Sequence, residues 1–272
     1  MMSVMQRLTR FAELVRTGSF EPSDEPLRLG VDLGTSNIVL AVADASGHPV
    51  AGAWRQASVV RDGVVVDWAG AVQTVRELTA ILADRLQVRF SEAAVTVPPG
   101  IGPETVKVFT NVLQACELDT AEVVDEPVAA ARALTLTDGA IIDIGHGTTG
   151  VSLLRNGKAM ISIDEPTGGH HMTLIISGAL GLDYQEAEEY KCSVANRDQV
   201  AGLVHPTLEK MATIAQRALR HQEVPQVQLV GGASAVASAR DVFSSVLGLP
   251  IQQPLEPLFP TPLGAALRSN HG

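Results

Sequence analysis

The sequence predicts an α/β protein built from two similar lobes. Three observations predict this fold class. A unit of strand, polar glycine-rich bend, strand, turn and strand occurs near residue 30 and again near residue 140. Short apolar runs alternate with helical stripes over the rest of the chain. The 272 residues, 46% of them hydrophobic and 18% charged, suffice for about two domains of ~150 residues with buried cores.

The first 26 residues are expected to form an N-terminal segment of a helix followed by a linker. Apolar residues of 1–17 recur at helical spacing: Val4, Leu8, Phe11 and Val15. The stretch 18–26 (GSFEPSDEP) contains two prolines, a glycine and several acids, which is typical of a linker. Two interpretations remain open. The amphipathic helix docks onto a partner or a shell, or it packs on its own domain, because so short a helix is only marginally stable alone.

The first copy of the repeated unit begins at Leu27. Apolar runs predict strands at 27–31, 38–43 and 49–54, with a polar bend at 32–37 between the first two. Between the two copies, helices are expected at 69–88, 103–116 and 127–134, and short strands at 93–97 and 121–124.

The second copy has strands at 140–142, 151–154 and 159–163, with its bend at 143–150. Asp32 precedes the turn glycine Gly47 by 15 positions, and Asp143 precedes Gly157 by 14 positions. The two aspartates therefore occupy equivalent places 111 residues apart.

The last part of the chain returns to the first lobe. A strand at 229–230 runs into Gly231 and Gly232, which are expected to open a helix, and a final helix is expected from Thr261. These elements predict a first lobe of residues 27–135 plus 258–272 and a second lobe of residues 136–257.

Charge and cysteine content exclude several classes of protein. The 20 Lys and Arg against 30 Asp and Glu give a formal charge of −10, which argues against a nucleic-acid or membrane partner. The two cysteines cannot form a disulfide framework. No run reaches the ~18 apolar residues of a membrane span, and charged residues interrupt the start before a signal peptide could form. We therefore expect a cytoplasmic location.

The segment 145–150 (GHGTTG) fits the glycine pattern of dinucleotide-binding folds, but its context does not. Such a fold needs a helix directly after the glycines, so that the helix N-terminus faces the pyrophosphate. The residues that follow are rich in β-formers and are bent by Asn156 and Gly157. Dinucleotide binding is therefore disfavoured.

The two bends carry groups suited to a triphosphate. Backbone N–H groups and hydroxyls in Gly-, Thr- and Ser-rich bends bind phosphate oxygens. An Asp at the mouth of each bend suits Mg²⁺, which takes one or two carboxylates together with water and phosphate. Two bends that face each other would clamp ATP with Mg²⁺ between them. Glu126, at a strand-to-helix junction, could polarise the attacking water.

Five ordered motifs in the chain resemble the actin, Hsp70 and sugar-kinase superfamily: LGVDLGTSN (29–37), VVDEPVAAA (123–131), IIDIGHGTTGV (141–151), LVGGASAV (229–236) and TPLGAAL (261–267). The resemblance implies a two-lobed actin-like, ribonuclease H-like ATPase fold, here with reduced upper subdomains. It implies that Asp32 and Asp143 hold hydrated Mg²⁺, and that Glu126, Asp143 and Thr148 are catalytic. It also implies nucleotide-binding residues: Gly34, Thr35, Ser36, Asn37, Gly145, Gly147, Thr148, Thr149, Gly231 and Gly232.

Glu188 and Lys191 resemble an E-x-x-K pair that contacts ribose in bacterial actins and Hsp70s. The alternative, a surface i, i+3 ion pair, is equally supported. Other stretches resemble a narrower family of Hsp70-like proteins of ethanolamine utilisation, which is associated with bacterial microcompartments: 59–72, 97–100, 165–174, 186–191 and 205–215.

The second bend departs from the superfamily pattern. His146 replaces a glycine, so a positive φ would be costly there and the ring would crowd or contact a phosphate. His170 and His171 are adjacent, but no third ligand at suitable spacing supports a metal site.

Three functions follow from these features. The first is a slow ATPase whose lobe closure acts on a protein partner, either an ethanolamine-pathway enzyme or a microcompartment shell. The second is a small-molecule kinase, for which 44–70 offers Asp62 and Asp67 but no polar cluster rich enough to bind a sugar. The third is a non-hydrolysing actin-like assembly module. The oligomeric state is not predicted.

Overall fold

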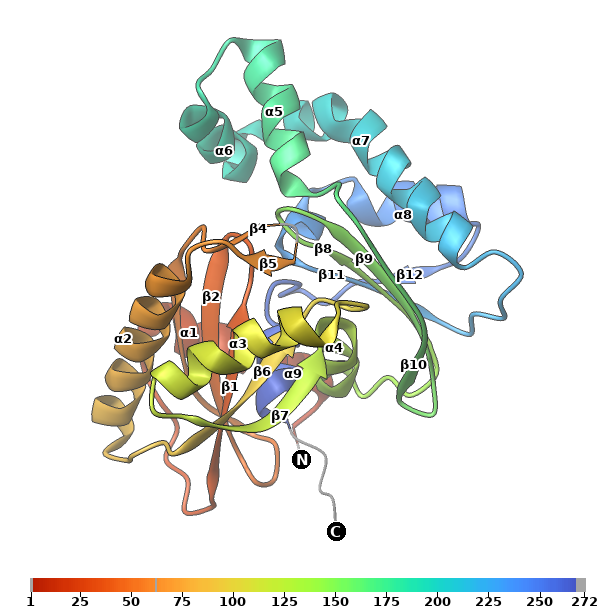
Figure 1. Ribbon diagram of the computed structural model, residues 1–272. Coiled ribbons are helices and arrows are strands. Elements are labelled where there is room, and N and C mark those ends of the chain that lie inside the picture. The colour runs from red at the N-terminus through yellow and green to blue at the C-terminus, as the bar shows by residue number, and fades with distance from the viewer. Residues whose placement is uncertain (1, 62, 268–272) are drawn as a thin grey trace.

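The computed structural model describes residues 2–61 and 63–267. Asp62 and the end of the predicted first lobe, 268–272, lie outside the described residues. Two five-stranded mixed sheets form the two halves of the molecule (Figure 1). None of the helices in the described ranges has the length and apolar character that a membrane crossing requires.

The first sheet has the order β3-β2-β1-β6-β7. Its strands are β1 (Leu27–Leu33), β2 (Asn37–Asp44), β3 (Pro49–Gln56), β6 (Glu92–Val97) and β7 (Asp119–Asp125). The helices α2 (Trp68–Leu86) and α3 (Pro103–Ala115) pack on it, and β4 (Val60–Arg61) pairs with β5 (Val64–Val65) beside it. The expected stripe on α2 is buried, because Val72, Val75, Leu78 and Leu82 belong to the core of this sheet.

The second sheet has the order β10-β9-β8-β11-β12. Its strands are β8 (Gly139–Ile144), β9 (Thr149–Arg155), β10 (Lys158–Glu165), β11 (Val227–Val230) and β12 (Ile251–Gln252). The helices of this half are α5 (Gly169–Leu180), α6 (Tyr184–Cys192), α7 (Arg197–Ala218) and α8 (Ala239–Leu247), with single 3₁₀ turns at Val194–Asn196 and Gly232–Ala235.

The two sheets repeat one pairing scheme. In each, the first strand pairs antiparallel with the second and the second with the third, and two further strands add in parallel. Asp32 lies opposite Val39, and Asp143 lies opposite Gly150, so both bends are closed at the same register. The duplication that the sequence predicts is therefore present in the strand pairing.

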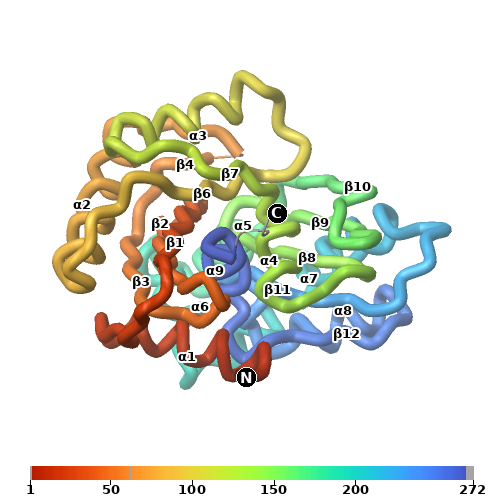
Figure 2. The backbone as a smooth tube through the Cα atoms, turned by 90° about the horizontal axis from the view of Figure 1, so that it is seen from below, coloured from red at the N-terminus to blue at the C-terminus, as the bar shows by residue number. Residues whose placement is uncertain are grey.

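Two short helices join the halves. The helices α4 (Glu126–Leu134) and α9 (Pro260–Ala266) pack against each other near the centre of the molecule (Figure 2). A Cβ added to Gly264 would lie 1.7 Å from the Ala129 carbonyl oxygen. Glycine at this position therefore permits the close crossing of α4 and α9.

The N-terminal helix α1 (Val4–Thr17) packs on its own fold and does not stand apart. Phe11 is fully buried and meets Phe259 edge-on, with ring centroids 5.5 Å apart. Arg16 donates two hydrogen bonds to Glu256, at 2.7 and 2.5 Å. The linker also contributes, since Phe20 forms a β-bridge with Ala51 on β3. Of the two interpretations of this helix, the structure supports packing on its own domain.

Candidate nucleotide site

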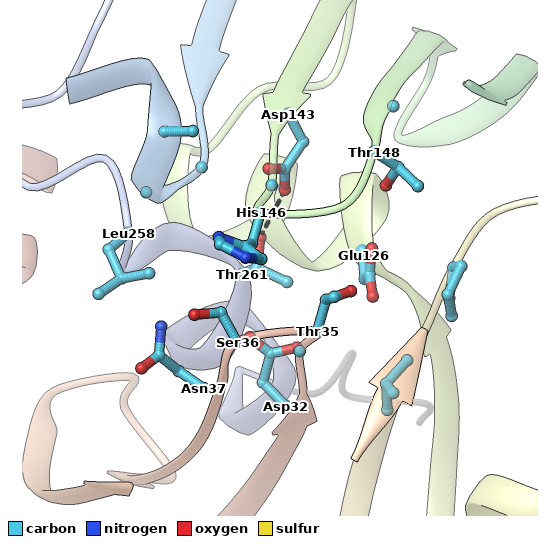
Figure 3. A pocket seen from close by; sticks show the side chains of 18 of the residues that line it. Asp32, Thr35, Ser36, Asn37, Glu126, Asp143, His146, Thr148, Leu258 and Thr261 are labelled. Atoms are coloured by element: carbon cyan, nitrogen blue, oxygen red, sulfur yellow. Dashed lines mark hydrogen bonds between the residues drawn. The ribbon is translucent and has the colours of Figure 1, made fainter. Parts of the chain in front are cut away.

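The two bends face each other across a cavity of about 280 Å³. The bend between β1 and β2 supplies Thr35 and Ser36, and the bend between β8 and β9 supplies Thr148 (Figure 3). A Cβ added to Gly147 would lie 3.3 Å from Thr35 Cγ2, which places the two bends nearly in contact. Equivalent bends of a duplicated unit have therefore come together around one space.

Three carboxylates converge in this cavity from β1, α4 and β8. Burial raises the pKa of Asp32 to about 6, although Thr96 donates a 2.6 Å hydrogen bond to its Oδ1. Burial and the charge of Asp32 raise the pKa of Asp143 to about 7. Burial, and then Asp32 and Asp143, raise the pKa of Glu126 well above its ordinary value.

These acids fit a cation. No ion pair of Asp32, Glu126 or Asp143 is found among residues 2–61 and 63–267, so their mutual repulsion is not offset by a basic side chain. Within the same ranges no group of three or more His, Cys, Asp and Glu residues is placed to hold a metal directly. Mg²⁺ at nucleotide sites takes only one or two carboxylates and completes its shell with phosphate oxygens and water. Asp32 and Asp143 are suited to that arrangement.

Residues of α6 and of the turn after β11 also line the cavity. Lys191 donates hydrogen bonds to Glu188 Oε2 and Thr173 Oγ1, both at 2.8 Å, and to the Gly169 carbonyl at 3.2 Å. Burial alone would raise the pKa of Glu188, but the hydrogen bonds from Lys191 and Thr173 outweigh burial and lower it. The pair forms an i, i+3 ion pair, yet it lines the cavity and Lys191 is only 7% exposed. The pair is therefore an ion pair, as the second interpretation requires, and it also lies at the cavity, as a contact with ribose requires.

Gly231 and Gly232 line the cavity as well, but they do not open a long helix. They lead into the single 3₁₀ turn Gly232–Ala235, and α8 begins only at Ala239. Gly231 has φ +88°, and a Cβ there would meet Asp143 Oδ1 at 2.2 Å. This glycine is therefore needed for the turn to approach the acid.

Nearly all the predicted site residues meet at this cavity. Those that line it are Asp32, Gly34, Thr35, Ser36, Asn37, Glu126, Asp143, Gly145, Thr148, Glu188, Lys191, Gly231 and Gly232. Gly147 and Thr149 are not among the lining residues. Gly147 lies beside Thr35 of the facing bend, and the Thr149 side chain is fully buried, with its hydroxyl donating to the Thr167 carbonyl at 2.5 Å. The sequence prediction of Thr149 as a phosphate ligand therefore does not agree with its placement.

Sequence reasoning missed four residues. Thr96 and Thr261 donate to the two aspartates, the latter at 3.3 Å to Asp143 Oδ2, and Asp164 and Leu258 line the cavity. Thr261 belongs to the last motif, 261–267, in which we predicted no site residue. His146 also lines the cavity, and it is absent from the positive-φ residues of the described chain, so its replacement of glycine causes no backbone strain.

The duplicated mixed sheets and the acid-lined cavity between them define a protein with the fold of the actin-like ATPases. The family model of the cell division protein FtsA matches residues 140–264. The structure of MreB5 of Spiroplasma citri bound to AMPPNP superposes with a TM-score of 0.73 at 15% identity, covering 90% of this chain and 96% of that one, which shows the fold alone.

Two further relatives identify the family. The ethanolamine utilization protein EutJ of Salmonella typhimurium is 40% identical over 245 residues, which are 90% of this chain and 86% of that protein. The crystal structure of EutJ from Carboxydothermus hydrogenoformans is 40% identical, with a TM-score of 0.92 and coverage of 98% of both chains. The chain therefore belongs to the EutJ family of ethanolamine utilization proteins, and both predicted resemblances are confirmed.

Proposed function

We propose that this protein binds ATP with Mg²⁺ between its two halves, hydrolyses it slowly, and uses the nucleotide-dependent closure to act on a protein partner in ethanolamine utilization. The observation that carries the proposal is the convergence of Asp32, Glu126 and Asp143 on a cavity between two facing Thr-bearing bends. The solved MreB5 structures with AMPPNP and ADP support nucleotide binding by a protein of this fold.

Different residues of the cavity would bind the phosphates, the Mg²⁺ and the attacking water. Backbone N–H groups of the two bends and the hydroxyls of Thr35, Ser36 and Thr148 bind phosphate oxygens. Asp32 and Asp143 would hold the Mg²⁺, which when bound neutralises charge that develops on the transferred phosphate. Burial and the neighbouring acids raise the pKa of Glu126, so its ionised form is the stronger base toward the attacking water, whereas its protonated form cannot accept that proton.

The identity of the protein partner is also proposed. Membership of the EutJ family supports a partner in ethanolamine utilization. We propose that this partner is an enzyme of the pathway or a microcompartment shell, and that the protein is cytoplasmic. The apolar face of α1 already packs on β3 and α9. The interaction with a partner would therefore use another surface or require α1 to detach.

A small-molecule kinase is less well supported. Asp67, one of its two candidate acids, accepts a hydrogen bond from the Gly70 N–H at 2.9 Å and caps α2. A cap at the start of a helix has a structural role, because it satisfies a free backbone donor. This hydrogen bond accounts for Asp67, and the other candidate acid, Asp62, lies outside the described residues.

Phosphate release from ATP, measured with and without ethanolamine-pathway enzymes, tests the proposal. Glu126→Gln should keep nucleotide binding and lose at least about 100-fold in hydrolysis, because it removes the base but little of the volume. Glu104→Gln, an exposed acid on α3, is the matched control and should hydrolyse normally. Release that survives Asp143→Ala, or that requires a small acceptor, would contradict an ATPase. Binding without release in the native protein would favour an assembly module instead.

A further inference from the structure

A row of three polar rings links the second bend to α5 and α6. The Tyr184 hydroxyl lies 3.0 Å from His146 Nε2 and 2.8 Å from His170 Nδ1. The rings of His146 and His170 have centroids 5.8 Å apart, and those of His170 and Tyr184 5.2 Å. One hydroxyl therefore bridges two imidazoles from different elements.

The start of α5 is also fixed to the same bend through the backbone. The Gly169 N–H donates to the Gly145 carbonyl at 2.9 Å, and the His170 N–H donates to the His146 carbonyl at 2.7 Å. His171, the neighbour of His170, has a different task, since its Nδ1 accepts from the Gly168 N–H and caps α5. His171 therefore caps α5, whereas its neighbour His170 belongs to the bridge.

The bridge constrains where the proton of His146 lies. Burial lowers the pKa of His146, so the ring is neutral near pH 7, while burial raises the pKa of Tyr184, so the hydroxyl keeps its proton. A single hydroxyl proton can be donated to only one of the two rings. If His170 donates to Tyr184 and Tyr184 donates to His146 Nε2, then His146 carries its proton on Nδ1.

The other ring nitrogen is left for a ligand. No hydrogen bond of His146 Nδ1 occurs within residues 2–61 and 63–267, and the ring is one of the side chains that line the cavity (Figure 3). With the proton on Nδ1, this nitrogen is a donor that suits an anionic oxygen. In the opposite order of protons Nδ1 is a bare acceptor, which a phosphate would disfavour.

We propose that the His146 imidazole donates a hydrogen bond from Nδ1 to the phosphate chain of the bound nucleotide, and that Tyr184 and His170 hold the ring in the required tautomer. This inference rests on the proposed nucleotide site. Tyr184 and His170 are positioning residues, because they act only through His146. The same bridge connects a phosphate bound at His146 to α5 and α6.

Nucleotide affinity tests the contact. In calorimetry, His146→Ala should weaken the binding of ATP or ADP by about ten-fold, and Tyr184→Phe should weaken it by about three-fold. The affinity for adenosine should stay unchanged. Tyr190→Phe is the matched control, because the other tyrosine of the chain donates to Gln199 at 2.6 Å and touches no histidine. Equal losses for adenosine and ATP, or no loss in either variant, would overturn the proposal.

Ring-nitrogen NMR tests the tautomer independently of affinity. In native protein with ATP, His146 should give the pattern of a neutral ring with its proton on Nδ1, and Tyr184→Phe should mix the two tautomers. An Nε2-protonated His146 in the complex would refute the assignment. If native protein binds no nucleotide, the proposed function fails as well; if it binds but the variants behave as native protein, only this inference fails.

Discussion

Replacing Asp143 by Asn is expected to stabilise the nucleotide-free protein and to abolish its response to Mg²⁺ and ATP. Burial and the nearby Asp32 raise the pKa of Asp143 from 3.8 to about 7. The native protein therefore retains a proton that the unfolded chain releases above about pH 4. This contribution to stability is complete below about pH 4 and is lost as the pH rises to about 7. The amide introduced by Asp143→Asn does not titrate, and it can still accept the hydrogen bond from Thr261.

The magnitude follows from the interval between the two pKa values of Asp143. At ~1.36 kcal/mol per pH unit, 3.8 to about 7 corresponds to about 4 kcal/mol. Asp143 is only partly buried at the cavity wall, so solvent screening reduces this to about 2 kcal/mol. We therefore expect Asp143→Asn to raise the free energy of unfolding by about 2 kcal/mol at pH 8 and by nearly nothing at pH 4.

Urea denaturation at several pH values, with and without Mg²⁺ and ATP, measures both effects. Asp119→Asn, at the exposed start of β7, controls for the loss of one negative charge. Mg²⁺ and ATP should raise the urea midpoint of native protein and of the control but not of Asp143→Asn, because only a ligand that binds the folded state stabilises it. A gain that is independent of pH, or no larger than that of the control, would refute the reasoning.

Two further predictions concern the framework. Gly264→Ala should lower the free energy of unfolding by more than about 3 kcal/mol in urea denaturation, because its Cβ would overlap the Ala129 carbonyl. Gly202→Ala, in open space on α7, is the control and should be neutral or stabilising. A small loss for Gly264→Ala would mean that α4 and α9 separate easily. Phe11→Ala should cost about 3–4 kcal/mol, because it empties a fully buried site against Phe259; unchanged stability would show that α1 is detachable.

The candidate site was largely predictable because its main residues belong to local patterns. A strand, an Asp and a bend of Gly, Thr and Ser form within a few residues, and their repetition placed Asp32 and Asp143 in equivalent positions. A local pattern does not state which of two neighbouring side chains faces the cavity. Thr148, in the bend, lines the cavity, whereas Thr149, the first residue of β9, is turned into the fold, where it bonds to Thr167.

Other features depend on contacts that no local pattern encodes. Thr96 is 64 residues from Asp32 and Thr261 is 118 residues from Asp143, so only the folded chain brings these donors to the acids. The fate of α1 was undecided for the same reason. Its apolar face predicts burial, but the surface that buries it, including Phe259, comes from the other end of the chain.

The two copies of the repeated unit differ in what surrounds their bends. In the first copy, α1 and the linker pack on β3 around Ala51 and Gly52, away from the bend, and α1 buries Phe11 there. The second bend instead contacts α5 directly, through two backbone hydrogen bonds and the Tyr184 bridge. The second bend can therefore move together with α5, to which it is hydrogen-bonded. Because tight packing resists small shifts and polar contacts rearrange at lower cost, a change in the phosphates should be transmitted mainly through the second half of the protein.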